Sequence, residues 1–228
     1  MGKEKKSRDG FLLELDKLEI PTGAHVILWG SGSIVSRLIA FIQWIWLGVR
    51  NAPTHVQRSY NKYLDFSAEW NGVRLIDREK KYRKARRVVI ALHAKFQEEG
   101  IEGQFVKNCN KYNNAKYDFF FYFLVLFRVF IIFSPIVMLW TGIVKPLSMI
   151  PMAIIYAIIY WPLNAILRRK SKKSWACAEL SNQQDNELGI PTGIKINHNT
   201  SPLYYHRIIQ AAPQEFDVLI DSGWLSKK

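Results

Sequence analysis

One of the two cysteines of this chain lies where it could act as a nucleophile. Cys177 is part of the run SWACAELS, residues 174–181, which has the pattern of a helix start. A thiol at a helix start has its thiolate stabilised by unpaired N–H groups and by the helix dipole. Such a thiolate can attack a carbonyl carbon if a histidine lies within hydrogen-bond reach and a third polar group orients that histidine. The residue types also allow a second interpretation, a small buried apolar side chain, which is what most free cysteines are.

The other residues that could carry chemistry have less suitable surroundings. Cys109 lies in a polar stretch without a helix-start pattern, and we expect it to take no part in a reaction. Four histidines show no metal-ligand spacing with one another or with cysteine, so no metal site is expected; they are His25, His93, His198 and His206. Residues 30–32 (GSG) lack the further glycines and the lysine of a phosphate-binding loop. The sequence therefore predicts neither a metal nor any other cofactor.

Short apolar segments predict the elements that must position Cys177. Alternating or β-branched runs bounded by turn residues predict strands at 24–29, from 55 onward, and at 64–70, 73–76 and 88–92. Asn71-Gly72 between two of these runs is a strong hairpin signal. Apolar residues at three- and four-residue spacing predict a helix from Ile34 to Trp46. The polar stretch 95–114 is expected to be a helix and a loop.

The most apolar part of the chain, residues 119–167, predicts a membrane hairpin. Phe119 to Trp140 contains one charge, Arg128, and Pro146 to Leu167 contains none. Each segment meets the length of about 20 residues that crosses a bilayer core. A pair of soluble core helices is the alternative, but the rest of the chain is short for enclosing two such helices.

Basic residues suggest how such a hairpin would be oriented. The chain has 32 Lys and Arg against 19 Asp and Glu, a formal net charge of +13. A basic cluster directly follows the second apolar segment and predicts contact with anionic lipid headgroups; it contains Arg168, Arg169, Lys170, Lys172 and Lys173. With basic residues at both ends of the hairpin, the positive-inside rule places both termini and the polar part on the cytoplasmic side. Nucleic acid is not the expected partner, and the role of a second basic run at 78–87 stays open.

Composition excludes several classes of protein. Two cysteines are too few for a disulfide-stapled secreted scaffold. A content of 14% aromatic residues and 13 scattered glycines excludes collagenous, repeat and disordered chains. Residues 1–10 are polar and basic, with no apolar core of a signal peptide directly after them, and are interpreted as a solvated tail.

Several short motifs follow one another in a definite order. Residues 53–56 (PTHV), then Ala68-Glu69 with 72–74 (GVR), and finally 175–180 (WACAEL) are the main ones. In this order they resemble the motifs of permuted papain-like cysteine peptidases and amidases, the NlpC-related superfamily and its YiiX-like branch. In that family a Ser/Thr-His-Val run begins a strand, an acidic residue orients the histidine, and the nucleophile comes last.

The resemblance covers roughly residues 20–120 and 174–220 and implies a role for three residues. Cys177 is then the nucleophile, His55 takes the proton of its thiol, and Glu69 orients the imidazole. The implied fold is α+β, a permuted papain-like domain with a small antiparallel sheet packed on the nucleophile-bearing helix, plus the two-helix apolar hairpin. Its expected parts are a basic tail and lead-in at 1–19, a first domain part at 20–118, the hairpin at 119–167 and a second domain part at 168–228.

The expected function is that of a membrane-attached thiol hydrolase. It would cleave amide bonds of peptides or isopeptides, or acyl bonds, through an acyl-enzyme. The alternative is a catalytically silent, membrane-associated structural or binding protein that retains the fold, for example a viral component. Reactivity of Cys177 discriminates between these functions.

Overall fold

The computed structural model describes residues 7–30, 34–118, 174–193 and 201–226, with single positions between 134 and 158. The chain divides into two compact units. One comprises Met1–Tyr117 with Trp175–Lys228, and the other comprises Asp118–Ser174. The second unit falls almost wholly outside the described residues, so the architecture below is that of the first.

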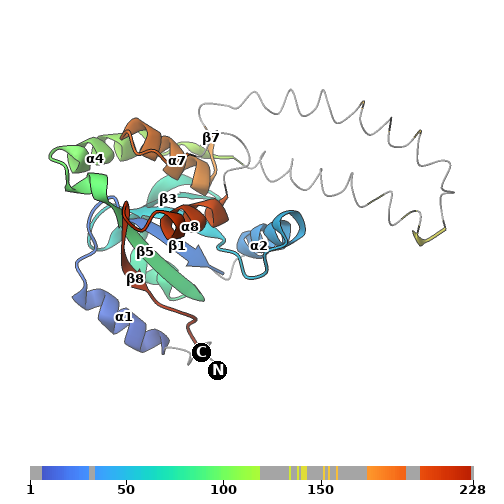
Figure 1. The fold of residues 1–228 in the computed structure, drawn as a ribbon, viewed down its shortest axis with the longest axis horizontal. Helices are drawn as coiled ribbons and strands as arrows, with labels where there is room; N and C mark the ends of the chain where they lie inside the picture. Colours follow the sequence, from blue (N-terminus) through green and yellow to red (C-terminus); the bar gives the residue numbers. More distant parts are fainter. Residues whose placement is uncertain are drawn as a thin grey trace. The chain divides into compact units, whose positions relative to one another are not determined.

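A six-stranded antiparallel sheet lies at the centre of the first unit (Figure 1). Its strand order is β4 (Gly72–Asp77), β3 (Leu64–Glu69), β2 (His55–Ser59), β1 (His25–Trp29), β5 (Arg87–His93) and β8 (Phe216–Asp221). All neighbouring strands pair antiparallel. The first unit is therefore α+β, with its consecutive strands β2, β3 and β4 forming one side of the sheet.

The turn between β3 and β4 lies one residue earlier than the hairpin signal predicts. Glu69 pairs with Gly72, so the turn residues are Trp70 and Asn71. Gly72 has a φ of 116°, a conformation that L side chains rarely adopt. A Cβ atom at this position would also lie 3.0 Å from the carbonyl oxygen of Ala115. Glycine is therefore required here by both the backbone conformation and the close approach.

Both faces of the sheet carry an apolar core, as the alternation along β1 requires. Val26 and Leu28 contribute to one core cluster, which includes Phe11 of α1 (Arg8–Lys17). Ile27 contributes to the other cluster, which includes residues of α7 (Cys177–Glu187) and α8 (Pro202–Ala211). Part of the segment predicted as a tail and lead-in is therefore a helix whose apolar side chains belong to the core.

The remaining described elements are short or peripheral. They are α2 (Ile34–Leu47), α3 (Arg78–Tyr82), the 3-10 helix η1 (Ala94–Gln97) and α4 (Ile101–Tyr112). Two further strands, β6 (Lys116–Tyr117) and β7 (Ser174–Trp175), form a separate two-stranded sheet. Strand β7 directly precedes α7 and leads the chain to Cys177.

The membrane part of the predicted fold class and the predicted two-span localisation are wrong for the described part of the chain. No helix among the described residues has the length and apolar character that a bilayer span needs. Helix α2 is strongly apolar, but its 14 residues extend about 21 Å against a hydrocarbon core of about 30 Å. The two predicted spans, 119–140 and 146–167, lie outside the described residues apart from single positions. The basic cluster at 168–173 lies outside them too, so its binding to lipid stays a prediction.

Candidate active site

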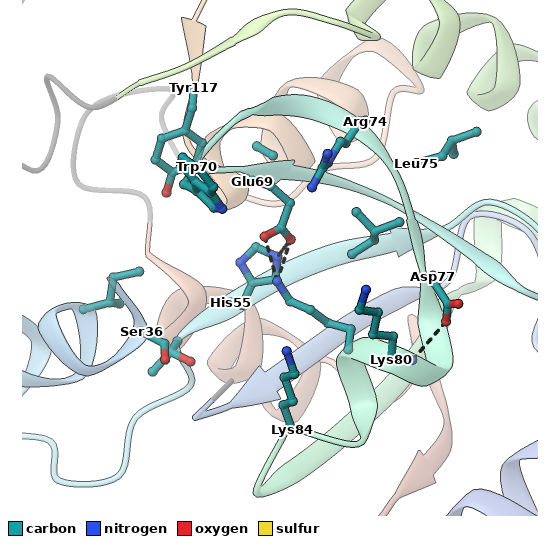
Figure 2. Close-up of a pocket in the computed structure, with 15 residues that line it drawn as sticks. Ser36, His55, Glu69, Trp70, Arg74, Leu75, Asp77, Lys80, Lys84 and Tyr117 are labelled. Atoms are coloured by element: carbon teal, nitrogen blue, oxygen red, sulfur yellow. Dashed lines mark hydrogen bonds and ion pairs between the residues drawn. The ribbon is translucent and has the colours of Figure 1, made fainter. Parts of the chain in front are cut away.

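Two of the predicted site residues lie opposite each other on adjacent strands. β2 and β3 pair with Ser59 opposite Asp65. His55 is the first residue of β2 and Glu69 is the last residue of β3, so both lie at the same end of these antiparallel strands. The Nε2 atom of His55 lies 3.1 Å from Oε1 of Glu69 (Figure 2). The pairing of the two strands thus brings together the imidazole and the carboxylate.

Ser67, which sequence reasoning missed, also holds the imidazole. Its Oγ atom lies 2.7 Å from Nε2 of His55 and donates a hydrogen bond to Oε1 of Glu69 at 3.0 Å. Because the hydroxyl proton goes to Glu69, the oxygen of Ser67 accepts the N–H of Nε2. Ser67 and Glu69 are two residues apart on β3, and residues at this spacing point to the same face of a strand. That alternation is the signal that could have identified Ser67.

Cys177, the third predicted residue, is the first residue of α7. Hydrogen bonding from the His55 side chain and from the backbone N–H of Val56 lowers the pKa of its thiol. Since Nε2 of His55 is bound by Ser67 and Glu69, Nδ1 is the ring nitrogen left for the thiol. The helix start is fixed by Glu179, whose Oε2 accepts the N–H of Ala176 at 3.3 Å. The structure therefore brings Cys177, His55 and Glu69 into one chain of contacts.

The charges in this chain of contacts favour a thiolate beside an imidazolium. Burial and the charge of Lys81 lower the pKa of His55, but the Glu69 carboxylate and the Cys177 thiolate outweigh them and raise this pKa to about 9. Burial opposes ionisation of Cys177, yet the His55 imidazolium and two hydrogen bonds lower the pKa of the thiol below its ordinary value. At a pH above the pKa of Cys177 and below the pKa of His55, we expect an ionised, nucleophilic sulfur beside a protonated imidazole.

The other cysteine shows what burial does to a thiol that has no histidine beside it. Cys109 on α4 is 1% exposed and Cys177 is 3% exposed, so the two thiols are almost equally buried. Burial raises the pKa of Cys109 to about 12. The charge of Arg58 and a hydrogen bond from the Gln184 amide, at 3.4 Å, both lower this pKa but do not offset the cost of burial. The contrast between the two thiols therefore comes from His55 and not from solvent access.

Lys81 on α3 binds the far side of the Glu69 carboxylate. Its Nζ atom lies 2.7 Å from both Oε1 and Oε2 of Glu69. Although burial opposes the charged carboxylate, His55 and Lys81 together lower the pKa of Glu69. Glu69 thus stays ionised and fixed between two cations. Lys81 belongs to the basic run whose role the sequence left open, and no local pattern marks it as part of the site.

His55 and Glu69 line a cleft of about 430 Å³ (Figure 2). Helix α2 contributes Ser36 and Ile39 to its lining, and the β3–β4 turn contributes Trp70. Cys177 is not among the described residues that line the cleft. The cleft therefore opens on the imidazole and the carboxylate, whereas the sulfur is buried next to the imidazole.

A buried polar network fixes the helix that carries the thiol. Asp185 of α7 accepts hydrogen bonds from Arg58 and from Tyr205, the latter at 2.9 Å, and its Oδ2 lies 3.0 Å from Nε2 of His25. All four side chains are fully buried. Arg58 follows His55 by three residues on β2, and Asp185 follows Cys177 by eight on α7. The ion pair between Arg58 and Asp185 therefore holds strand β2, which carries His55, against helix α7, which carries Cys177.

Comparison with known proteins adds no relative. No family model matches the chain, and no curated protein matches it. Within the described residues, no group of three or more His, Cys, Asp and Glu is placed to hold a metal ion. The geometry and the charges around Cys177 are thus the observations that bear on function.

Proposed function

We propose that this protein is a thiol hydrolase, with Cys177 as its nucleophile, that cleaves amide bonds of peptides or isopeptides, or acyl bonds. The observation that carries the proposal is a buried thiol at a helix start next to an imidazole that a carboxylate orients. The chain order His55, Glu69, Cys177 also resembles that of permuted papain-like peptidases and amidases. This order supports the same assignment of roles.

In the proposed reaction, the Cys177 thiolate attacks the carbonyl carbon of the substrate and forms a tetrahedral intermediate. The N–H groups of Cys177 and Ala178, at the start of α7, have no intrahelical acceptor and stabilise the negative oxygen in this proposal. The imidazolium of His55 gives its proton to the leaving nitrogen or oxygen as the bond to carbon breaks, which leaves a thioester on Cys177. Glu69 and Ser67 keep the imidazole ring in place during this transfer.

A water molecule completes the cycle. The now neutral His55 takes a proton from the water as its oxygen attacks the thioester carbon. The bond from carbon to sulfur then breaks, the acid product leaves, and the Cys177 thiolate again faces a His55 imidazolium. Atoms and charge balance with water as the only co-reactant.

Iodoacetamide should modify Cys177 well below pH 8, while Cys109 stays almost unreactive. The reason is that the thiolate reacts and the thiol does not. The two rates are measured on the wild-type chain at graded pH by mass spectrometry of the separated peptides. Because both thiols are nearly equally buried, a difference between them reports ionisation. The same pH profile for both cysteines would contradict the proposed function.

One observation favours the alternative, a binding protein that keeps the fold without catalysis. Cys177 is only 3% exposed, whereas a nucleophile must reach a substrate carbonyl. A silent protein of this kind could still carry an ionised thiol. Formation of an acyl-enzyme therefore separates the two functions more sharply than alkylation does.

A further inference from the structure

The cleft beside His55 has an excess of positive charge. Its lining contains two carboxylates, those of Glu69 and Asp77. It also contains four cationic side chains: Arg74, Lys80, Lys81 and Lys84. The balance is therefore two positive charges in excess, even before the imidazolium of His55 is counted.

Three of these cations have no partner among the residues that the structure describes. Lys81 pairs with Glu69, and Asp77 accepts the backbone N–H of Lys80 at 2.9 Å as the N-cap of α3. Of the four cationic side chains in the cleft, Arg74, Lys80 and Lys84 make no ion pair or hydrogen bond with the described part of the chain. Their charges are thus available to a ligand.

The fold turns these three cations toward the candidate active site. Arg74 of β4 pairs with Ser67 of β3, so both side chains lie on the sheet face that carries Glu69. Lys80 and Lys84 come from α3 and the turn after it. Figure 2 shows Arg74 on one side of the cleft and the two lysines on another, with their charged ends directed toward the space in front of His55 and Glu69.

We infer that this cleft binds an anionic group of the substrate, a carboxylate or a phosphate, next to the bond that Cys177 attacks. This inference rests on the proposed function and narrows its substrate to molecules that carry such an anion. An arginine provides a planar pair of donors and a lysine provides a point charge, and both suit carboxylate and phosphate oxygens. A cleft lined by one sign of charge also raises the local concentration of an oppositely charged reactant.

Two alkylating agents with the same reactive carbon test this inference. Iodoacetate carries a carboxylate and iodoacetamide is neutral, so the ratio of their rates at Cys177 measures attraction of the anion. The ratio should exceed that for free cysteine. It should fall about tenfold in the triple variant Arg74→Gln, Lys80→Gln, Lys84→Gln, which removes the three unpaired charges.

A matched variant controls for net charge. Arg207, Lys17 and Lys107 are exposed, lie on α8, α1 and α4, and do not line the cleft. The triple variant Arg207→Gln, Lys17→Gln, Lys107→Gln removes the same charge and should leave the rate ratio unchanged. Equal ratios in wild type and both variants overturn the inference, while low-pH reaction with iodoacetamide would still support the proposed function.

A second measurement identifies the anion without using the thiol. Binding of inorganic phosphate and of acetate to the wild-type chain is measured by calorimetry at constant ionic strength. If phosphate gives a binding heat with wild type and the control variant but not with the cleft variant, the substrate anion is a phosphate. The same pattern with acetate supports a carboxylate. Binding of neither anion, or binding that persists in the cleft variant, overturns the inference. Loss of low-pH alkylation alone would instead reject the proposed function.

Discussion

Replacing His55 with alanine should slow the alkylation of Cys177 at pH 6 by about a hundredfold or more. The imidazolium is the cation that lowers the pKa of the buried thiol, and burial then acts alone. A thiol with an ordinary or raised pKa is about one part in a thousand ionised three pH units below that value. Rates at Cys177 are measured with iodoacetamide in wild type and variant from pH 5 to 10. Because burial raises the pKa of the almost equally buried Cys109 to about 12, the rate of the variant should still lie below that of wild type at pH 10.

Glu69→Gln provides a graded comparison in the same assay. The amide oxygen can still accept a hydrogen bond from Nε2 of His55, but it no longer stabilises the imidazolium. We expect the pH 6 rate at Cys177 to fall between those of wild type and the His55→Ala variant. Cys109 is the internal control, since neither substitution touches its surroundings. An unchanged rate at Cys177 in the His55→Ala variant would show that another group ionises the thiol.

Replacing Asp185 with alanine should lower the free energy of unfolding by about 3–5 kcal/mol. The substitution leaves the guanidinium of Arg58 fully buried without its carboxylate, and removal of one partner of a buried ion pair costs this much. It also removes the acceptor of the Tyr205 hydroxyl. Urea unfolding of wild type and variant measures the difference. A loss of less than about 1 kcal/mol would show that the pair does not hold α7 on the sheet.

A surface pair on the same helix is the matched control for Asp185→Ala. Glu187 of α7 pairs with Lys111, whose side chain is 58% exposed. Glu187 also accepts hydrogen bonds from the Tyr112 hydroxyl and the Gln183 amide, so Glu187→Ala should cost about 1–2 kcal/mol, still less than loss of the buried pair. The stability that the ion pair between Arg58 and Asp185 contributes should also depend on pH. Burial opposes ionisation of Asp185, but Arg58 and His25 lower its pKa to about 2. Its contribution is therefore present above about pH 4, the ordinary pKa of an aspartate, and is lost as pH falls toward 2.

Local patterns in the sequence were sufficient to predict much of the sheet. The runs 24–29, 64–70, 73–76 and 88–92 fall within one residue of the ends of β1, β3, β4 and β5. These strands alternate or are β-branched, and clear turn residues bound them, so short-range chemistry determines their ends. The order of the sheet was not predictable in this way. Strand β8 pairs with β5 across more than a hundred residues, a contact that no local pattern encodes.

Some residues of the candidate site were likewise predictable from local motifs, whereas others depend on tertiary structure. Three short motifs, through their resemblance to those of permuted papain-like peptidases, predicted Cys177, His55 and Glu69. Lys81 was hidden in a run of similar basic residues, and only the packing of α3 brings it to Glu69. Arg58 is a polar residue in the middle of a strand. Its burial against Asp185, 127 residues away in the chain, depends on tertiary structure.

The membrane prediction rested on length and apolar content at 119–140 and 146–167, and no helix among the described residues supports it. A run of about 20 apolar residues satisfies the rule for a bilayer span whether lipid or protein encloses it. Helix α2 illustrates the point within the described chain. It is strongly apolar, yet its Ser36 and Gln43 are buried against protein, and Gln43 donates a hydrogen bond to the carbonyl of Pro53 at 2.7 Å.

Formation of an acyl-enzyme tests the central claim most directly. The wild-type chain is mixed with p-nitrophenyl acetate, quenched in acid within one turnover, and analysed by intact mass and peptide mapping. The proposed hydrolase should carry one acetyl group on Cys177. This group should be absent from Cys177→Ala and should form much more slowly in His55→Ala, while Cys109 stays unmodified in all three proteins. Acetylation of lysines alone, equal in wild type and Cys177→Ala, would contradict a catalytic role for Cys177.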